Sequence, residues 1–87
     1  MSNRERFLYR ISVSDGLTGV NRIVQVMRQR RYDVVWLRAH VGRNAVWLAD
    51  VVVVATEKDV EFFVKRLNRL PCVLKVLPLQ SFDRPWT

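Results

Sequence analysis

The sequence has 87 residues, 49% of them hydrophobic, and a formal net charge of +7; it is therefore too apolar for a disordered chain and long enough for only one domain. One cysteine excludes an internal disulfide, one histidine argues against a zinc cluster, and no apolar run reaches the ~20 residues of a membrane helix. We expect one cytoplasmic domain over residues 1–87, with a core at about 6–79 and a tail at 80–87, and its positive charge favours anionic partners.

The first strand and the first helix are indicated by a change of hydrophobic period. A half-buried strand is predicted by the alternating residues Phe7, Tyr9, Ile11 and Val13. Asp15-Gly16 ends this strand, and Gly16 and Gly19 bracket a tight loop. From Val20 onward the spacing becomes that of a helix, whose buried stripe contains Val20, Ile23, Val24 and Met27.

The remaining elements follow in a similar order. A second strand at 34–41 is expected to direct its odd-numbered residues to the core, namely Val35, Leu37, Ala39 and Val41. A hairpin at 42–44 leads to a third strand at 45–55, which is apolar on both faces apart from Asp50. Thr56 caps a second helix with the stripe Val60, Phe63, Val64 and Leu67. Pro71 ends that helix, and residues 72–79 form the last strand.

The order strand, helix, strand, strand, helix, strand predicts an α+β fold, a ferredoxin-like βαββαβ sandwich. Right-handed crossovers place both helices on one face of a four-stranded antiparallel sheet with the strand order 4-1-3-2. The opposite face of the sheet is then left without a covering layer.

This open face is the first candidate for a partner interface. The alternation of the strands assigns it Leu8, Arg10, Ser12, Trp36, Arg38, His40, Val46, Leu48, Asp50, Val52, Val54, Val73, Lys75 and Leu77. Trp36, Arg38 and His40 belong to an expected edge strand, which can also pair with a second copy to form a homodimer. A basic cluster at the end of the first helix contains Arg28, Arg30 and Arg31. It either complements the helix dipole or docks a partner.

Catalytic and metal-binding patterns are missing from the sequence. No nucleophile or acid can be assigned to His40 as a partner, and Cys72 falls on the core side of the last strand. Asp50 can pair with Arg10 or with Arg38 across the sheet. Because no phosphate-binding loop, metal spacing or nucleophile elbow is present either, the sequence argues against an enzyme.

Nucleic acid is the next partner to consider, because the RNA-recognition motif has the same topology. That motif stacks bases on aromatic residues of its first and third strands. Here the corresponding exposed positions carry no aromatic residue, and Trp36 lies on the second strand. The sequence therefore argues against nucleic acid as the partner.

The loop at 16–20 has two interpretations. The first interpretation is a ligand site, because this loop precedes or opens a helix, where free N–H groups can hold a carboxylate. The loop consists of Gly16, Leu17, Thr18, Gly19 and Val20. A tight strand-to-helix turn that binds nothing explains the same residues.

Three segments in order resemble a known family. They are the acid-glycine loop ending at Gly19-Val20, the helix end Arg30-Arg31-Tyr32-Asp33-Val34, and the run Leu67-Asn68-Arg69-Leu70-Pro71-Cys72-Val73-Leu74-Lys75-Val76. Together they resemble the ACT domain and, more narrowly, the small regulatory subunit of acetolactate synthase (acetohydroxyacid synthase). The resemblance covers about residues 7–79.

The resemblance implies a homodimer that activates a catalytic large subunit in branched-chain amino-acid biosynthesis. Thiamine diphosphate, magnesium and FAD are then expected on that subunit, with no cofactor in this chain. It also implies an effector site between residues 16–20 of one copy and Asp33 of the other. Gly16 and Asp33 stand where asparagines are common in the family, and a second domain is absent, as in the short valine-insensitive type. The alternative is a stand-alone ACT sensor of another small molecule, such as an amino acid.

Overall fold

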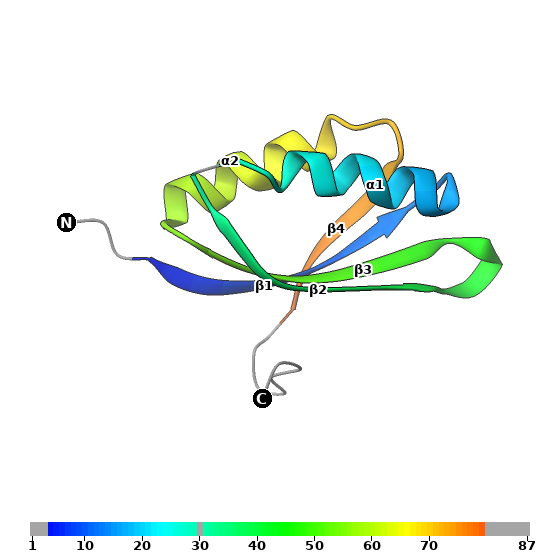
Figure 1. The fold of residues 1–87 in the computed structure, drawn as a ribbon, viewed down its shortest axis with the longest axis horizontal. Helices are drawn as coiled ribbons and strands as arrows, with labels where there is room; N and C mark the ends of the chain where they lie inside the picture. Colours follow the sequence, from blue (N-terminus) through cyan, green and yellow to red (C-terminus); the bar gives the residue numbers. More distant parts are fainter. Residues whose placement is uncertain (1–3, 30, 80–87) are drawn as a thin grey trace.

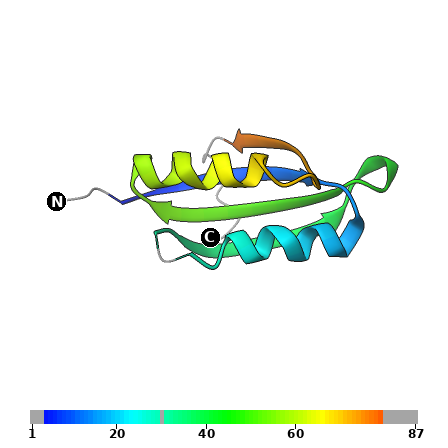
Figure 2. The same ribbon diagram turned by 90° about the horizontal axis from the view of Figure 1, so that it is seen from above.

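The computed structural model describes residues 4–29 and 31–79, and the tail expected at 80–87 lies outside this part. The elements in chain order are β1 (Glu5–Val13), α1 (Gly16–Val26), β2 (Asp33–Val41), a 3-10 turn η1 (Arg43–Ala45), β3 (Trp47–Ala55), α2 (Glu57–Asn68) and β4 (Val73–Leu79). The strands form one antiparallel sheet in the order β2-β3-β1-β4, and both helices cover the same face (Figures 1 and 2). This confirms the predicted ferredoxin-like sandwich. Neither described helix is long and apolar enough to cross a bilayer.

The core lies between the helices and one face of the sheet. Its fully buried side chains include Ile11, Val13, Ile23, Val51, Val53, Phe63 and Leu67. The predicted stripe of α2 is buried at Val60, Phe63 and Leu67, and Thr56 caps this helix by accepting a hydrogen bond from the Asp59 N–H at 3.2 Å. Of the first predicted stripe, Val20, Ile23 and Met27 are buried. Val24 is only half-buried, and Val26 is buried instead.

Tyr32, which the sequence analysis did not assign to the core, closes the gap between the end of α1 and α2. Its side chain is 1% exposed, and its hydroxyl donates a hydrogen bond of 2.7 Å to the Val26 carbonyl. Its ring meets the Phe63 ring edge-on at 4.8 Å between centroids. Burial raises the pKa of Tyr32, although the nearby charges of Arg66 and Arg31 act in the opposite direction.

Two β-bulges change the faces predicted for the edge strands. In β2 the register shifts between Val34 and Trp36, so Val34 pairs with core residue Val53 and Val35 is 55% exposed instead of buried. In β4 the shift falls at Leu74, so Val73 packs against the core and not on the open face. A bulge adds one residue to a strand, which reverses the side to which every residue beyond it points.

Two element boundaries also differ from the prediction. The helix expected from Val20 begins at Gly16, so residues 16–20 are its first turns and not a loop. The β2–β3 connection is longer than expected, because η1 includes Asn44 and Ala45, which both have a positive φ. As a result β3 begins at Trp47, and Val46, which was assigned to the open face, lies in the connection.

Candidate functional site

The turn from β1 into α1 is built by two consecutive left-handed residues. Asp15 has φ 66° and Gly16 has φ 58°, and the Asp15 side chain makes no capping hydrogen bond. The Gly19 N–H reaches the Asp15 carbonyl at 3.3 Å and closes the first helical turn. The preceding N–H groups, those of Gly16, Leu17 and Thr18, have no acceptor within the helix. This end of α1 therefore presents donors, as the sequence predicted for residues 16–20, but from a helical turn.

Gly19 has a structural role that is separate from any ligand. A Cβ atom at this position would overlap the Ser14 carbonyl oxygen and lie 2.5 Å from Val13 Cγ1. The absence of a side chain lets α1 lie against the end of β1, and Gly19 and Val20 are both buried. Leu17, by contrast, is 67% exposed and Thr18 is exposed too. Within the predicted effector segment 16–20, Leu17 and Thr18 are the exposed side chains.

Asp33 lies far from this turn within one chain. It pairs with Val54 near the start of β1, whereas Gly16 follows the opposite end of β1. A strand of nine residues spans about 30 Å. Asp33 is exposed and forms an ion pair of 3.1 Å with Arg4. A single chain therefore does not bring the predicted effector residues together.

The outer edge of β2 carries apolar side chains that the described part of the chain leaves exposed. Val35, Leu37 and Val41 are 55%, 41% and 57% exposed, and β2 has a neighbouring strand on one side only. Leu37 and Val41 lie on the helix side of the sheet, opposite Val51 and Trp47. Exposed apolar residues beside free backbone groups are typical of a strand that pairs with another chain.

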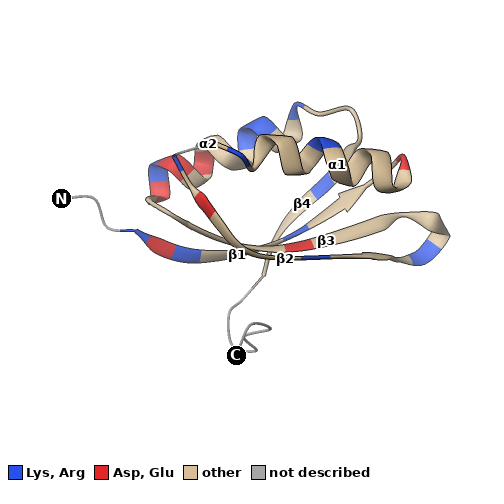
Figure 3. Cartoon of the chain, in the orientation of Figure 1, with Lys and Arg blue, Asp and Glu red and all other residues tan. Residues whose placement is uncertain are grey.

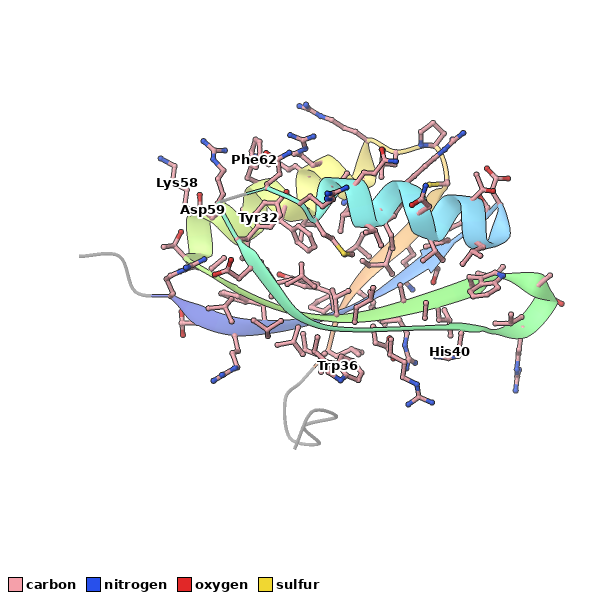
Figure 4. All side chains as sticks on the ribbon, viewed as in Figure 1. Tyr32, Trp36, His40, Lys58, Asp59 and Phe62 are labelled. Atoms are coloured by element: carbon pink, nitrogen blue, oxygen red, sulfur yellow. The ribbon has the colours of Figure 1, made fainter. Side chains whose placement is uncertain are left out.

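The open face has the composition expected from the alternation of β1, β2 and β3. Trp36, Arg38 and His40 lie opposite Val52, Asp50 and Leu48. Trp36 and His40 project away from the helices (Figure 4). Trp36 and His40 are half-buried and Arg38 is exposed.

Asp50 pairs with Arg10 and not with Arg38, which decides between the two predicted partners. Arg10 Nε and Nη2 donate hydrogen bonds of 2.8 and 3.0 Å to the two carboxylate oxygens. The hydrogen bond with Asp50 raises the pKa of Arg10, while burial acts in the opposite direction.

The residues of the basic cluster have different surroundings in the structure. Arg28 is exposed at the end of α1, and Arg30 lies outside the described residues. Arg31 stacks on Phe62 of α2, with 4.3 Å from Cζ to the ring centroid, and Arg66 approaches the same ring at 5.7 Å. Neither Phe62 nor Arg66 was singled out from the sequence, because Arg31, which stacks on this ring, comes from a distant part of the chain.

Two hollows flank Phe62. One, of about 370 Å³, is lined by Val26, Phe62, Arg66, Arg69 and Leu70. The other, of about 220 Å³, is lined by Arg31, Lys58, Asp59, Glu61, Phe62 and Lys65. We call the residues lining these two hollows the Phe62 surface. Phe62, Lys58 and Asp59 lie on the helix side of the molecule (Figure 4).

A further hollow of about 370 Å³ separates α2 from β4. Its lining residues are Tyr9, Glu61, Val64, Lys65, Val76 and Pro78. Burial, and secondarily the charge of Glu61, raise the pKa of Tyr9. The surface of this hollow is mostly apolar.

Within residues 4–29 and 31–79, no three His, Cys, Asp or Glu side chains are close enough to hold a metal ion. Cys72 is buried, as predicted, with its Sγ 3.8 Å from the Gly19 carbonyl oxygen.

No protein-family model and no curated protein matches the sequence. Among solved structures, the chain is similar to the solution NMR structure of the ACT domain from GTP pyrophosphokinase of Chlorobium tepidum. The TM-score is 0.76 at 12% sequence identity, and the match covers 92% of this chain and 91% of that one. The fold is therefore that of an ACT domain.

Proposed function

We propose that this chain is the non-catalytic regulatory small subunit of acetolactate synthase and that it activates the thiamine-dependent large subunit. The observation that carries the proposal is the coincidence of the family-like segments with defined parts of an ACT fold. The acid-glycine segment forms the β1–α1 turn, Tyr32-Asp33 leads into β2, and the run 67–76 joins α2 to β4. In this role thiamine diphosphate, magnesium and FAD belong to the large subunit, and the complex is cytoplasmic.

The working unit in this proposal is a homodimer joined along β2. Antiparallel pairing of two β2 strands brings the start of one beside the end of the other. The end of β2 lies beside the β1–α1 turn, because Val41 pairs with Trp47 and a Cβ on Gly16 would lie 3.5 Å from Trp47 Nε1. The partner's Asp33 would thus approach residues 16–20 of this chain. Two copies assemble the effector site that one chain does not form.

The proposed response of this site to valine is weak. Gly16 and Asp33 lack the side-chain amides that are common in the family and could donate hydrogen bonds to a bound amino acid. Repulsion between Asp33 and an amino-acid carboxylate contributes little, because Asp33 is exposed and paired with Arg4. The missing donors are the main reason for weak binding.

Reconstitution with an acetolactate synthase large subunit tests the proposal. The rate of acetolactate formation is expected to rise several-fold when this chain is added and to change little when valine is included. Size-exclusion chromatography on the same samples should show both chains in one peak. The proposal is wrong if the chain neither co-elutes with the large subunit nor changes its rate. Strong inhibition at low valine would contradict the weak-effector part alone.

A stand-alone ACT sensor is the second candidate, and the similarity to an ACT domain of a different enzyme favours it. In that case some small molecule would stabilise the free protein, because a ligand that binds only the folded state raises the unfolding temperature. A thermal-shift screen across amino acids, performed without the large subunit, distinguishes the two candidates.

A further inference from the structure

The ring of Phe62 in α2 contacts two arginines that come from different parts of the chain. Arg31 follows α1 and stacks on the ring at 4.3 Å, while Arg66 approaches from one turn further along α2 at 5.7 Å. Both contacts are within the range of a cation–π interaction. Both guanidinium groups therefore lie near one ring on the helix side of the molecule.

The Phe62 surface carries more positive than negative charge. Its two hollows are lined by five cationic and two acidic side chains, which are Arg31, Lys58, Lys65, Arg66, Arg69, Asp59 and Glu61. Figure 3 shows acidic positions at the start of α2 and basic positions toward its end. In the described part of the chain, side-chain ion pairs join Arg4 to Asp33 and Arg10 to Asp50, and none involves a cation of this surface.

The dipole of α2 explains only part of this arrangement. Lys65 and Arg66 lie in the last turn of α2, where cations are favourable. Arg31 does not belong to α2, and its position over Phe62 adds a like charge beside Arg66. Like charges repel each other, and an anion that contacts both guanidinium groups reduces that repulsion.

The floor of the larger hollow is apolar. Val26 is buried at the end of α1, and Leu70 is half-buried just after α2. With the edge of Phe62 they form a recess that suits an aliphatic side chain, bordered by Arg66 and Arg69. A complementary ligand therefore carries both an apolar group and carboxylates.

We propose that the Phe62 surface binds an acidic, amphipathic segment of a partner protein. An apolar side chain of that segment occupies the recess over Val26 and Leu70, and its carboxylates pair with Arg31 and Arg66, whose planar guanidinium groups suit bidentate contacts. This inference deepens the proposed docking function by naming the surface and the partner's chemistry. It does not depend on the effector site.

Nucleic acid fits this surface less well. Single-stranded nucleic acid binds by stacking its bases on aromatic faces within a basic groove. The contact at 4.3 Å places the Arg31 guanidinium over the Phe62 ring, where a base would have to stack. The recess beside it is lined by aliphatic side chains, which suit a leucine or isoleucine better than a base.

Fluorescence anisotropy with three labelled probes tests the proposal. The first probe is a short helical peptide with leucines spaced four residues apart and glutamates between them. The second has glutamine in place of every glutamate, and the third is a single-stranded oligonucleotide of similar length. The acidic peptide is expected to bind most tightly and to lose affinity as salt is raised. Equal binding of the first two probes, or tighter binding of the oligonucleotide, overturns the proposal.

Charge-reversal variants locate the site. Arg31→Glu and Arg66→Glu are each expected to weaken binding of the acidic peptide by about tenfold or more, because each loses a charge-assisted contact and adds repulsion. Arg43→Glu is the matched control, since it makes the same change of charge at an exposed position in η1. If all three variants lose the same affinity for the acidic peptide, the effect comes from the net charge of the protein and the proposal is overturned.

Phe62→Leu separates the aromatic contact from folding. This variant keeps an apolar side chain but removes the ring on which Arg31 and Arg66 stack, so peptide affinity should fall while the thermal unfolding curve stays cooperative. Unchanged affinity contradicts the proposed site. If the acidic peptide does not bind but the chain still activates a large subunit, this surface is rejected and the proposed function is not.

Discussion

Arg10 and Asp50 form a bidentate ion pair on the open face, joining the two central strands of the sheet. Their Cα atoms are direct partners in the β1–β3 ladder, and both hydrogen bonds are 3.0 Å or shorter. The two side chains differ in exposure, at 41% for Arg10 and 12% for Asp50. This asymmetry determines what happens when either partner is removed.

Removing Arg10 should destabilise the fold more than removing Asp50. Arg10→Ala leaves a nearly buried carboxylate without its partner, which costs about 2–3 kcal/mol of unfolding free energy. Asp50→Ala leaves a half-exposed guanidinium that can extend to water, at a cost of about 1 kcal/mol. Urea denaturation of both variants measures the difference. The double variant should lose less than the sum of the two single losses, and an additive result would contradict the coupling.

The open-face pair also shows where sequence reasoning succeeds. Regular alternation assigned Arg10, Arg38 and Asp50 to the same face, and the register places both arginines directly opposite Asp50. Only the side-chain contacts show that Arg10 makes the ion pair. The same rule failed at Val35 and Leu74, where a bulge adds one residue. No turn or glycine signal marks these bulges in the sequence. They become visible only when both strands of each pair are placed.

Gly19 should tolerate substitution less well than Gly16. Gly19→Ala drives a Cβ into the Ser14 carbonyl and Val13, so α1 must shift, at a cost of about 3 kcal/mol or more. At Gly16 the nearest atom to an added Cβ is Trp47 Nε1 at 3.5 Å, and Gly16→Ala mainly pays for its positive φ, about 1 kcal/mol. Thermal and urea unfolding of both variants compare them directly. A milder effect at Gly19 than at Gly16 would show that α1 can move without loss.

The candidate sites were predictable to different degrees. Residues 16–20 were found because glycines and a change of period are local signals. The Phe62 surface was not, because Arg31, Phe62 and Arg66 meet only once α1 and α2 are packed together. Phe62 also lies outside the predicted buried stripe of α2, beside the buried Phe63, so the hydrophobic period gives it no special role. Long-range contacts of this kind have no counterpart in hydrophobic periodicity.

Tyr32 should make the fold sensitive to alkaline pH. Burial raises its pKa in the folded state above an unfolded value of about 10. The folded state therefore holds the proton more tightly, so stability is unaffected below about pH 10 and falls as pH rises through the folded pKa. Tyr9 adds to the same trend.

Tyr32→Phe tests the contribution of this hydroxyl. Near neutral pH the variant should be about 1 kcal/mol less stable, because it loses the hydrogen bond to the Val26 carbonyl. The difference should shrink as pH rises above about 10, since the variant has no proton to lose at this position. Urea denaturation, monitored by tryptophan fluorescence from neutral to alkaline pH, measures the stability difference and its change with pH. A constant difference at all pH values would show that Tyr32 ionises equally easily in both states.

Pairing along β2 predicts that one lysine at the edge separates the proposed dimer. Leu37 is 41% exposed, and in a symmetric interface Leu37→Lys removes apolar contact and adds charge twice. The dissociation constant of the dimer should increase roughly a hundredfold, which corresponds to about 2–3 kcal/mol of binding free energy. Leu77→Lys is the matched control, because Leu77 is 40% exposed on β4 at the other edge of the sheet. Sedimentation velocity across a concentration series distinguishes the two variants. If the unsubstituted protein remains monomeric at high concentration, or if Leu77→Lys dissociates the dimer equally, β2 is not the interface and residues 16–20 lack the partner strand that completes the effector site.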